Sequence, residues 1–154
     1  MTLFLPCLLQ RWGGGVDGGD ERVLNATWAD VRDDVLRNLE WLLNTEAAHR
    51  IGRVDLPEAA CASTLCFGIP PYSGRPQSTM KPDEMAEEIR QRIAWFEPRL
   101  HPSHLKVNPI EETQTSHFNT LRFEVISVLL SNPLREFQVR TEIDMETGEA
   151  RLLP

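Results

Sequence analysis

The chain has 154 residues, 41% of them hydrophobic and 25% charged, which is typical of one soluble globular domain and excludes a largely disordered chain. A formal net charge of −7 and the lack of a basic cluster argue against nucleic acid as a partner. Three widely spaced cysteines, Cys7, Cys61 and Cys66, exclude a disulfide framework and favour a reducing compartment.

Residues 1–20 predict an apolar arm on a flexible tether. Leu3–Trp12 can form a short helix or an extended segment, and five glycines follow within the seven residues Gly13–Gly19. The arm either folds back on the core or docks on a partner protein. It lacks the positive start of a signal peptide and is too short to cross a bilayer. We therefore expect a cytoplasmic protein that is not embedded in a membrane.

Residues 21–154 predict a single domain that begins with an amphipathic helix. Thr27 and Asp30 have the spacing of a capping box, which marks a helix start. The helix should run to about Asn44–Thr45, because apolar residues recur at helical spacing at Val31, Val35, Leu36, Leu39, Leu42 and Leu43. We expect its other face to carry Arg32, Asp33, Arg37, Asn38 and Glu40.

A loop-rich crossover at Arg50–Gly74 leads to a second helix. Within the crossover, "TLCFGIPPYSG" predicts at most one short apolar turn or strand. Pro82 suits the first turn of the second helix, and the acidic residues after it favour the positive helix end. Pro98 cannot continue this helix, so it should end at the sequence Glu97–Pro98–Arg99. Its predicted buried stripe is Met85, Ile89, Ile93 and Phe96.

After residue 100 the apolar period changes to two. The stretches "LKVNPI", "LRFEV" and "FQVRTEID" alternate between apolar and polar residues, and "METGEARLL" predicts a turn at Thr147–Gly148 and a short last strand. Such strands have one buried face and one polar face. The predicted fold is therefore α+β, with two main helices packed on one face of a small antiparallel β-meander.

The residues that could take part in catalysis or bind a ligand do not form a recognisable catalytic, cofactor or metal site. The acidic pairs Asp33–Asp34, Glu87–Glu88 and Glu111–Glu112 are sequence neighbours that point in different directions, so we expect solvated surface. His101 and His104 lie in a predicted loop without an acidic third ligand. Nucleophile and phosphate-binding motifs are absent from the sequence. We therefore expect neither an enzyme nor a cofactor.

Two features favour binding to other proteins. The four tryptophans, at positions 12, 28, 41 and 95, are either extra core volume or exposed anchors for a partner. The strand Phe137–Asp144 is the second feature: if it or the last strand lies at a sheet edge, its unpaired backbone groups can receive a strand from another protein. The residues that we expect at this interface are Phe137, Val139, Thr141 and Ile143.

Four stretches, taken in chain order, form a recognisable series. They are "VLRNLEWLLNT" at Val35–Thr45, "TLCFGIPPYSG" at Thr64–Gly74, "IRQRIAWFEPRL" at Ile89–Leu100 and "TEIDMETGEARL" at Thr141–Leu152. With this series the chain resembles the TssE family, the small baseplate subunits of bacterial type VI secretion systems. TssE is similar to the wedge and sheath-initiator protein of contractile phage tails.

The resemblance implies a structural role. TssE sits in each baseplate wedge with TssF, TssG and TssK, and connects the baseplate, docked at the inner membrane, to the first ring of the TssB/TssC sheath. In related systems the sheath subunits exchange strands in shared sheets, and the initiator offers the first such sheet. The family has also been described as lysozyme-like, which leaves a muramidase-like peptidoglycan hydrolase as the alternative function.

The resemblance also gives a role to Glu97, Pro98 and Arg99. It implies that these residues belong to the face that meets the helical core of the wedge, where Pro98 keeps the backbone stiff and the two charges bind partner groups. The alternative is an internal salt bridge that locks the helix end onto the sheet.

Overall fold

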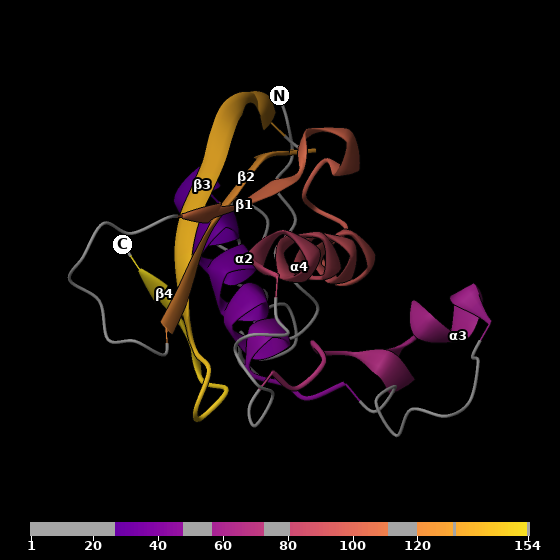
Figure 1. Ribbon diagram of the computed structural model, residues 1–154. Helices are drawn as coiled ribbons and strands as arrows, with labels where there is room; N and C mark the ends of the chain where they lie inside the picture. The colour runs from indigo at the N-terminus through magenta and orange to yellow at the C-terminus, as the bar shows by residue number, and fades with distance from the viewer. Residues whose placement is uncertain (1–26, 48–56, 73–80, 111–119, 131, 154) are drawn as a thin grey trace, which may run out of the picture.

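The computed structural model describes residues 27–47, 57–72, 81–110, 120–130 and 132–153. In this part of the chain, helices α2 (Trp28–Leu43) and α4 (Pro82–Phe96) precede a four-stranded sheet (Figure 1). The crossover between them contains the short helix α3 (Glu58–Cys61), which the sequence did not predict, and the 3-10 turn Thr64–Cys66. The apolar arm Leu3–Trp12 lies outside the described residues.

Helix α2 begins as the sequence predicts. The Thr27 hydroxyl oxygen accepts a hydrogen bond from the Asp30 N–H at 3.3 Å, and the Asp30 carboxylate accepts one from the Thr27 N–H at 2.7 Å. The capping box is therefore confirmed, and these hydrogen bonds hold the pKa of Asp30 below its ordinary value. The helix ends at Leu43 and is capped by Asn44, whose side-chain amide donates back to the Glu40 carbonyl at 2.9 Å.

The sheet is an antiparallel meander in the order β1-β2-β3-β4, which confirms the predicted class. Its strands are β1 (Lys106–Ile110), β2 (Thr120–Leu129), β3 (Asn132–Asp144) and β4 (Ala150–Leu153). Strand β3 begins five residues before Phe137, the start that the sequence predicts. The prediction missed these residues because Asn132, Pro133 and Arg135 interrupt the alternation from which a strand is inferred. A register shift in β2 between Val128 and Leu129 accompanies this irregular start.

One apolar cluster joins the helices to the sheet. Burial alternates along β2, and the buried strand residues share the cluster with the buried stripes of α2 and α4. Helix α4 contacts β1, and helix α2 contacts β4. The largest wholly buried side chains are Phe123, Phe137, Leu39, Leu42, Ile89 and Ile93. Loss of this shared core would unfold both layers together.

Thr141 is a polar exception in the core. Its side chain is 0% exposed, and its hydroxyl oxygen finds no hydrogen-bond partner among the described residues. Because a buried hydroxyl without a partner is costly, Thr141→Val should raise the free energy of unfolding by about 1 kcal/mol. In thermal unfolding, this gain corresponds to a midpoint about 2–4 °C higher.

The matched control is Thr147→Val in the β3–β4 turn. The Thr147 hydroxyl accepts a hydrogen bond from the Glu149 N–H at 3.2 Å and is exposed, so its replacement should not stabilise the protein. Equal midpoints for Thr141→Val and the wild type would show that the Thr141 hydroxyl is satisfied in solution.

Candidate functional site

The chain turns sharply where α4 ends. The Glu97 N–H donates to the Ile93 carbonyl at 2.8 Å, which closes the last turn of the helix. The exposed Pro98 follows, and the next residues then run along the end of β2. There the Leu130 N–H donates to the Arg99 carbonyl and the His101 N–H donates to the Val128 carbonyl, each at 2.9 Å. Backbone hydrogen bonds thus attach this corner to the sheet.

Side chains attach the same corner to α2. The Arg99 guanidinium donates to both oxygens of Glu97, from Nε and Nη2, each at 2.6 Å. Its remaining nitrogen, Nη1, donates to Asp34 Oδ2 at 2.6 Å. Asn38 Nδ2 donates to Glu97 Oε2 at 2.8 Å and to the Phe96 carbonyl at 3.2 Å. We call Asp34, Asn38, Glu97 and Arg99 the corner network.

The corner network is nearly closed to solvent. Glu97 is 0% exposed and the Asp34 side chain 4%, whereas the Arg99 side chain keeps 25%. Burial alone would lower the pKa of Arg99, but the hydrogen bonds and charges of Glu97, and then of Asp34, raise it above its ordinary value. Arg99 therefore stays cationic and compensates two carboxylates, and the exposed Arg37 reaches the Asp34 carboxylate at 3.1 Å.

Two roles were expected for Glu97–Arg99, contact with a partner and an internal salt bridge, and the structure contains the internal salt bridge. It joins the end of α4 to α2, and main-chain bonds make the link to the sheet. Glu97 is wholly inside the protein, so the parts of the corner that a partner can touch are Pro98 and the exposed quarter of Arg99.

Sequence reasoning missed Asp34 and Asn38. The expectation that Asp34 is solvated surface is wrong, because Asp34 follows Val31 by three residues and so lies at the margin of the buried stripe. Asn38 follows one turn later on the same face and is half-buried. A polar pair four residues apart beside an apolar stripe is the signal that could have identified both residues.

The strand residues expected at an interface have buried side chains. Phe137, Val139, Thr141 and Ile143 are at most 5% exposed and face the core. Strand β4 pairs with β3 only over Arg140–Ile143, so the main chain of Thr141 and Ile143 has a neighbour on both sides. Phe137 and Val139 lie beyond the end of β4, where β2 is the only strand that pairs with β3 among the described residues.

A comparison with known protein families gives a match for this chain. Residues 29–134, more than half of the chain, match the family described as baseplate wedge protein gp25. The chain belongs to this family. The family includes TssE, which confirms the resemblance seen in the sequence. None of the curated proteins compared with the chain matches it. The match contains the whole corner network, whereas most of β3 and all of β4 follow it.

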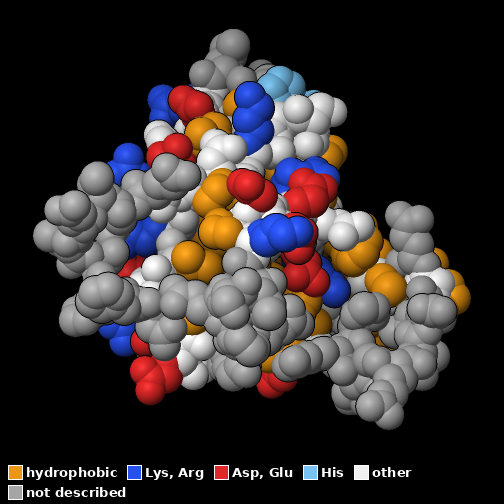
Figure 2. All heavy atoms as spheres, in the orientation of Figure 1, with side chains coloured by type: hydrophobic (Ala, Val, Ile, Leu, Met, Phe, Trp, Pro, Cys, Tyr) orange, Lys and Arg blue, Asp and Glu red, His pale blue; other side chains and the backbone are white. Residues whose placement is uncertain are grey.

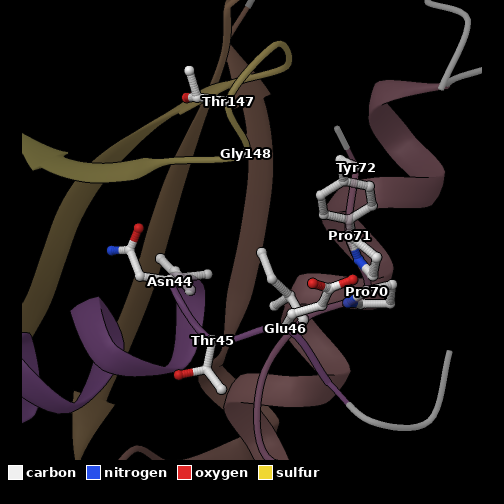
Figure 3. A pocket seen from close by; sticks show the side chains of 10 residues that line it. Asn44, Thr45, Glu46, Pro70, Pro71, Tyr72, Thr147 and Gly148 are labelled. Carbon is white, nitrogen blue, oxygen red and sulfur yellow. The ribbon is translucent and has the colours of Figure 1, made fainter. Parts of the chain in front are cut away.

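A hollow of about 150 Å³ lies at the end of α2 in this wedge-family fold (Figure 3). Two of its polar side chains have structural partners: Asn44 holds the backbone of Ala150 through two hydrogen bonds of 2.8 and 2.9 Å, and the Tyr72 hydroxyl donates to Glu88 at 3.0 Å. Among the described residues, the lining contains one carboxylate, Glu46, whereas glycoside hydrolysis uses two. The described lining therefore offers no acid pair.

The structure also describes the other chemical candidates, two histidines and two of the three cysteines. His101 and His104 lie at the 3-10 turn before β1 with ring centroids 4.5 Å apart. No group of three or more metal-ligating side chains is found in the part of the chain that the structure describes. Cys61 and Cys66 are buried. Of the helices described, none is both long and apolar enough to span a bilayer. Figure 2 shows acidic and basic side chains interspersed on one face of the wedge-family protein.

Proposed function

We propose that the chain is the TssE subunit of a type VI secretion system. In this role it is a structural, non-enzymatic component of the baseplate wedge that links the baseplate to the contractile sheath. The observation that carries the proposal is the family match over residues 29–134, because a baseplate wedge protein acts by holding other subunits together. The four stretches that resemble TssE support this choice within the family.

The proposed partners are TssF, TssG and TssK in the wedge and TssB and TssC in the sheath. The complex is assembled in the cytoplasm and docked at the inner membrane. The sheet of the wedge protein starts sheath assembly by pairing with a strand of the first sheath ring. This step requires main-chain hydrogen-bonding groups that no other strand of the protein uses. Among the described residues, β4 pairs only with Arg140–Ile143 of β3, and this supports strand pairing as the mode of binding.

Reconstitution tests this function directly. The purified protein should copurify with TssF–TssG, and wedges that contain it should start TssB–TssC polymerisation, whereas wedges that lack it should not. Polymerisation that is equally fast without the protein would contradict a role in sheath initiation.

The corner between α4 and the sheet is the proposed contact with TssF–TssG. The exposed Pro98 presents this contact and Arg99 supplies a partly exposed cation, while Glu97 holds Arg99 in place. Pro98→Glu adds bulk and charge at the surface without removing a member of the corner network. We expect it to weaken binding to TssF–TssG at least about tenfold, as measured by titration of the purified proteins.

Pro82→Glu is the control for this substitution. Pro82 is also exposed, but it lies at the opposite end of α4, where an acidic side chain suits the helix. The affinity of the Pro82→Glu protein for TssF–TssG should equal that of the wild type. If Pro98→Glu binds as tightly as Pro82→Glu, the corner lies outside the wedge interface.

The muramidase alternative depends on Glu97 and finds no support in its surroundings. Both carboxylate oxygens accept hydrogen bonds from Arg99, one also from Asn38, and the side chain is 0% exposed. A general acid must reach the oxygen of the scissile bond, and this carboxylate cannot. Incubation with peptidoglycan should release no soluble sugar; release that Glu97→Gln abolishes would establish the hydrolase instead.

A further inference from the structure

We propose that a partner adds its strand at the margin of β3 just beyond β4, at Glu136–Val139, and not at the margin of β1. The inference rests on the proposed function, because it locates the strand pairing described there. It is carried by the directions of the backbone groups, by a proline in β1 and by a groove beside α2. We call Glu136–Val139 the β3 margin.

The open side of the β3 margin carries backbone donors. At the far end of β3, the Asp144 N–H donates to the Glu149 carbonyl at 2.9 Å, and the Gly148 N–H donates to the Asp144 carbonyl at 2.7 Å. Asp144 thus directs both groups towards β4. In an antiparallel ladder alternate residues direct both groups to the same side. The N–H and C=O groups of Glu136 and Gln138 therefore point away from β2, on the β4 side.

The hydrogen bonds of β2 lead independently to the same directions. Val128 and Leu130 bond to the segment that follows α4, which lies on the β1 side. The backbone N–H and C=O groups of even-numbered residues in β2 therefore point to β1, and those of odd-numbered residues such as Val125 point to β3. Val125 is opposite Val139, so the odd-numbered residues of β3 bond to β2 and the even-numbered ones are directed outwards.

The margin of β1 offers far less. Asn108 is opposite Glu124, so its backbone N–H and C=O groups point to β2. The backbone groups of its neighbours Val107 and Pro109 point outwards, away from β2. Pro109 has no N–H to donate, and a proline at this position is a common protection of an edge strand. The Leu105 N–H is already bound to the Pro102 carbonyl at 3.3 Å. Val107 is left as the one outward donor among the described residues of β1.

A groove accompanies the β3 margin. It has a volume of about 460 Å³ and lies between α2 and the strands β3 and β4. Leu36, Val139, Leu152 and Leu153 form its apolar part, and Arg32, Asp33, Arg37 and Glu40 surround it. The groove is continuous with the line of β4, because Leu152 and Leu153 are the last described residues of that strand.

These features define the occupant as an extended segment of a partner protein. A strand that continues the line of β4 runs antiparallel to β3, and its side chains opposite Phe137 and Val139 face α2. Those side chains must be apolar, because they enter the groove beside Leu36. The side chains opposite Glu136 and Gln138 face solvent and can be polar. An alternating apolar and polar strand therefore fits this site.

The test compares two proline variants in binding to purified TssB–TssC. Gln138→Pro removes an outward N–H without touching the β2 ladder, and Gln138→Ala is its control because it keeps the N–H. Val107→Pro removes the outward donor of β1. We expect Gln138→Pro to weaken binding about tenfold or more, and the other two variants to bind as the wild type does.

A second measurement keeps the inference testable if Gln138→Pro fails to fold. In the wild-type protein, amide hydrogen exchange at Glu136 and Gln138 should be fast when the protein is free and slow after TssB–TssC is added, with no change at Val107. Slow exchange at both residues in the free protein would mean that a second copy or another segment of the chain covers the β3 margin, and would overturn the inference.

The outcomes separate the inference from the function on which it rests. Binding of TssB–TssC that depends on Val107, or on neither margin, overturns the location but leaves the proposed function intact. Failure of the folded wild-type protein to bind TssB–TssC, alone or in the wedge, overturns both. Weaker binding of Gln138→Pro alone supports both.

Discussion

Arg99→Met should lower the free energy of unfolding by about 3–5 kcal/mol, the usual cost of removing one member of a buried ion pair. Arg99 is the cation that contacts both Asp34 and Glu97, and these carboxylates are 4% and 0% exposed. Without Arg99 the two negative charges remain out of water, and the link between α4 and α2 is lost. The expected change is a large part of the total stability of a typical domain. Urea unfolding at neutral pH measures it.

Arg37→Met is the control, because Arg37 contacts the same Asp34 carboxylate at 3.1 Å but is 44% exposed. We expect it to cost at most about 1 kcal/mol. Equal losses for the Arg99 and Arg37 variants would show that the corner network is open to solvent.

Gly68→Ala should destabilise the protein by about 3 kcal/mol or more. Gly68 has φ of +118°, a conformation that residues with a Cβ rarely adopt, and an added Cβ would lie 2.3 Å from the Thr45 carbonyl oxygen. That oxygen accepts the Ile69 N–H at 2.9 Å, and the Ile69 carbonyl accepts the Ala47 N–H at 2.9 Å. The substitution must therefore separate the segment after α2 from the segment that leads to Tyr72. Thermal unfolding monitored by circular dichroism measures the loss.

Gly148→Ala serves as the comparison. Gly148 has φ of +79°, close to the left-handed helical region that other residues enter at a cost of about 1–2 kcal/mol. The Gly148→Ala protein should therefore unfold at a clearly higher temperature than the Gly68→Ala protein. A Gly68→Ala protein as stable as Gly148→Ala would mean that the contact between residues 45–47 and 68–69 is dispensable.

Helix positions could be predicted from the sequence because their signals are local. The Thr27–Asp30 capping box, Pro82 and Pro98 each act within one helical turn, and both long helices start or stop where these residues lie. The partners of Arg99 could not be predicted in the same way. Asp34 is 65 residues away in sequence, and only the packing of α4 against α2 brings the two side chains together.

The strands show the same division. Alternation predicted the meander, since each strand has one buried face. The edge status of β3 was not predictable, because it depends on where β4 stops. Among the described residues, β4 pairs with β3 at Thr141 but not at Gln138, so the same strand is interior at one position and lacks a described neighbour at the other. No local pattern distinguishes these two positions, as both lie in the same alternating run.

A structure of the wedge bound to the first TssB–TssC ring is the most direct test of the whole account. It should show an extended sheath segment hydrogen-bonded to Glu136 and Gln138, with an apolar side chain beside Leu36. A ring that contacts the protein elsewhere, with the β3 margin left in solvent, would contradict it.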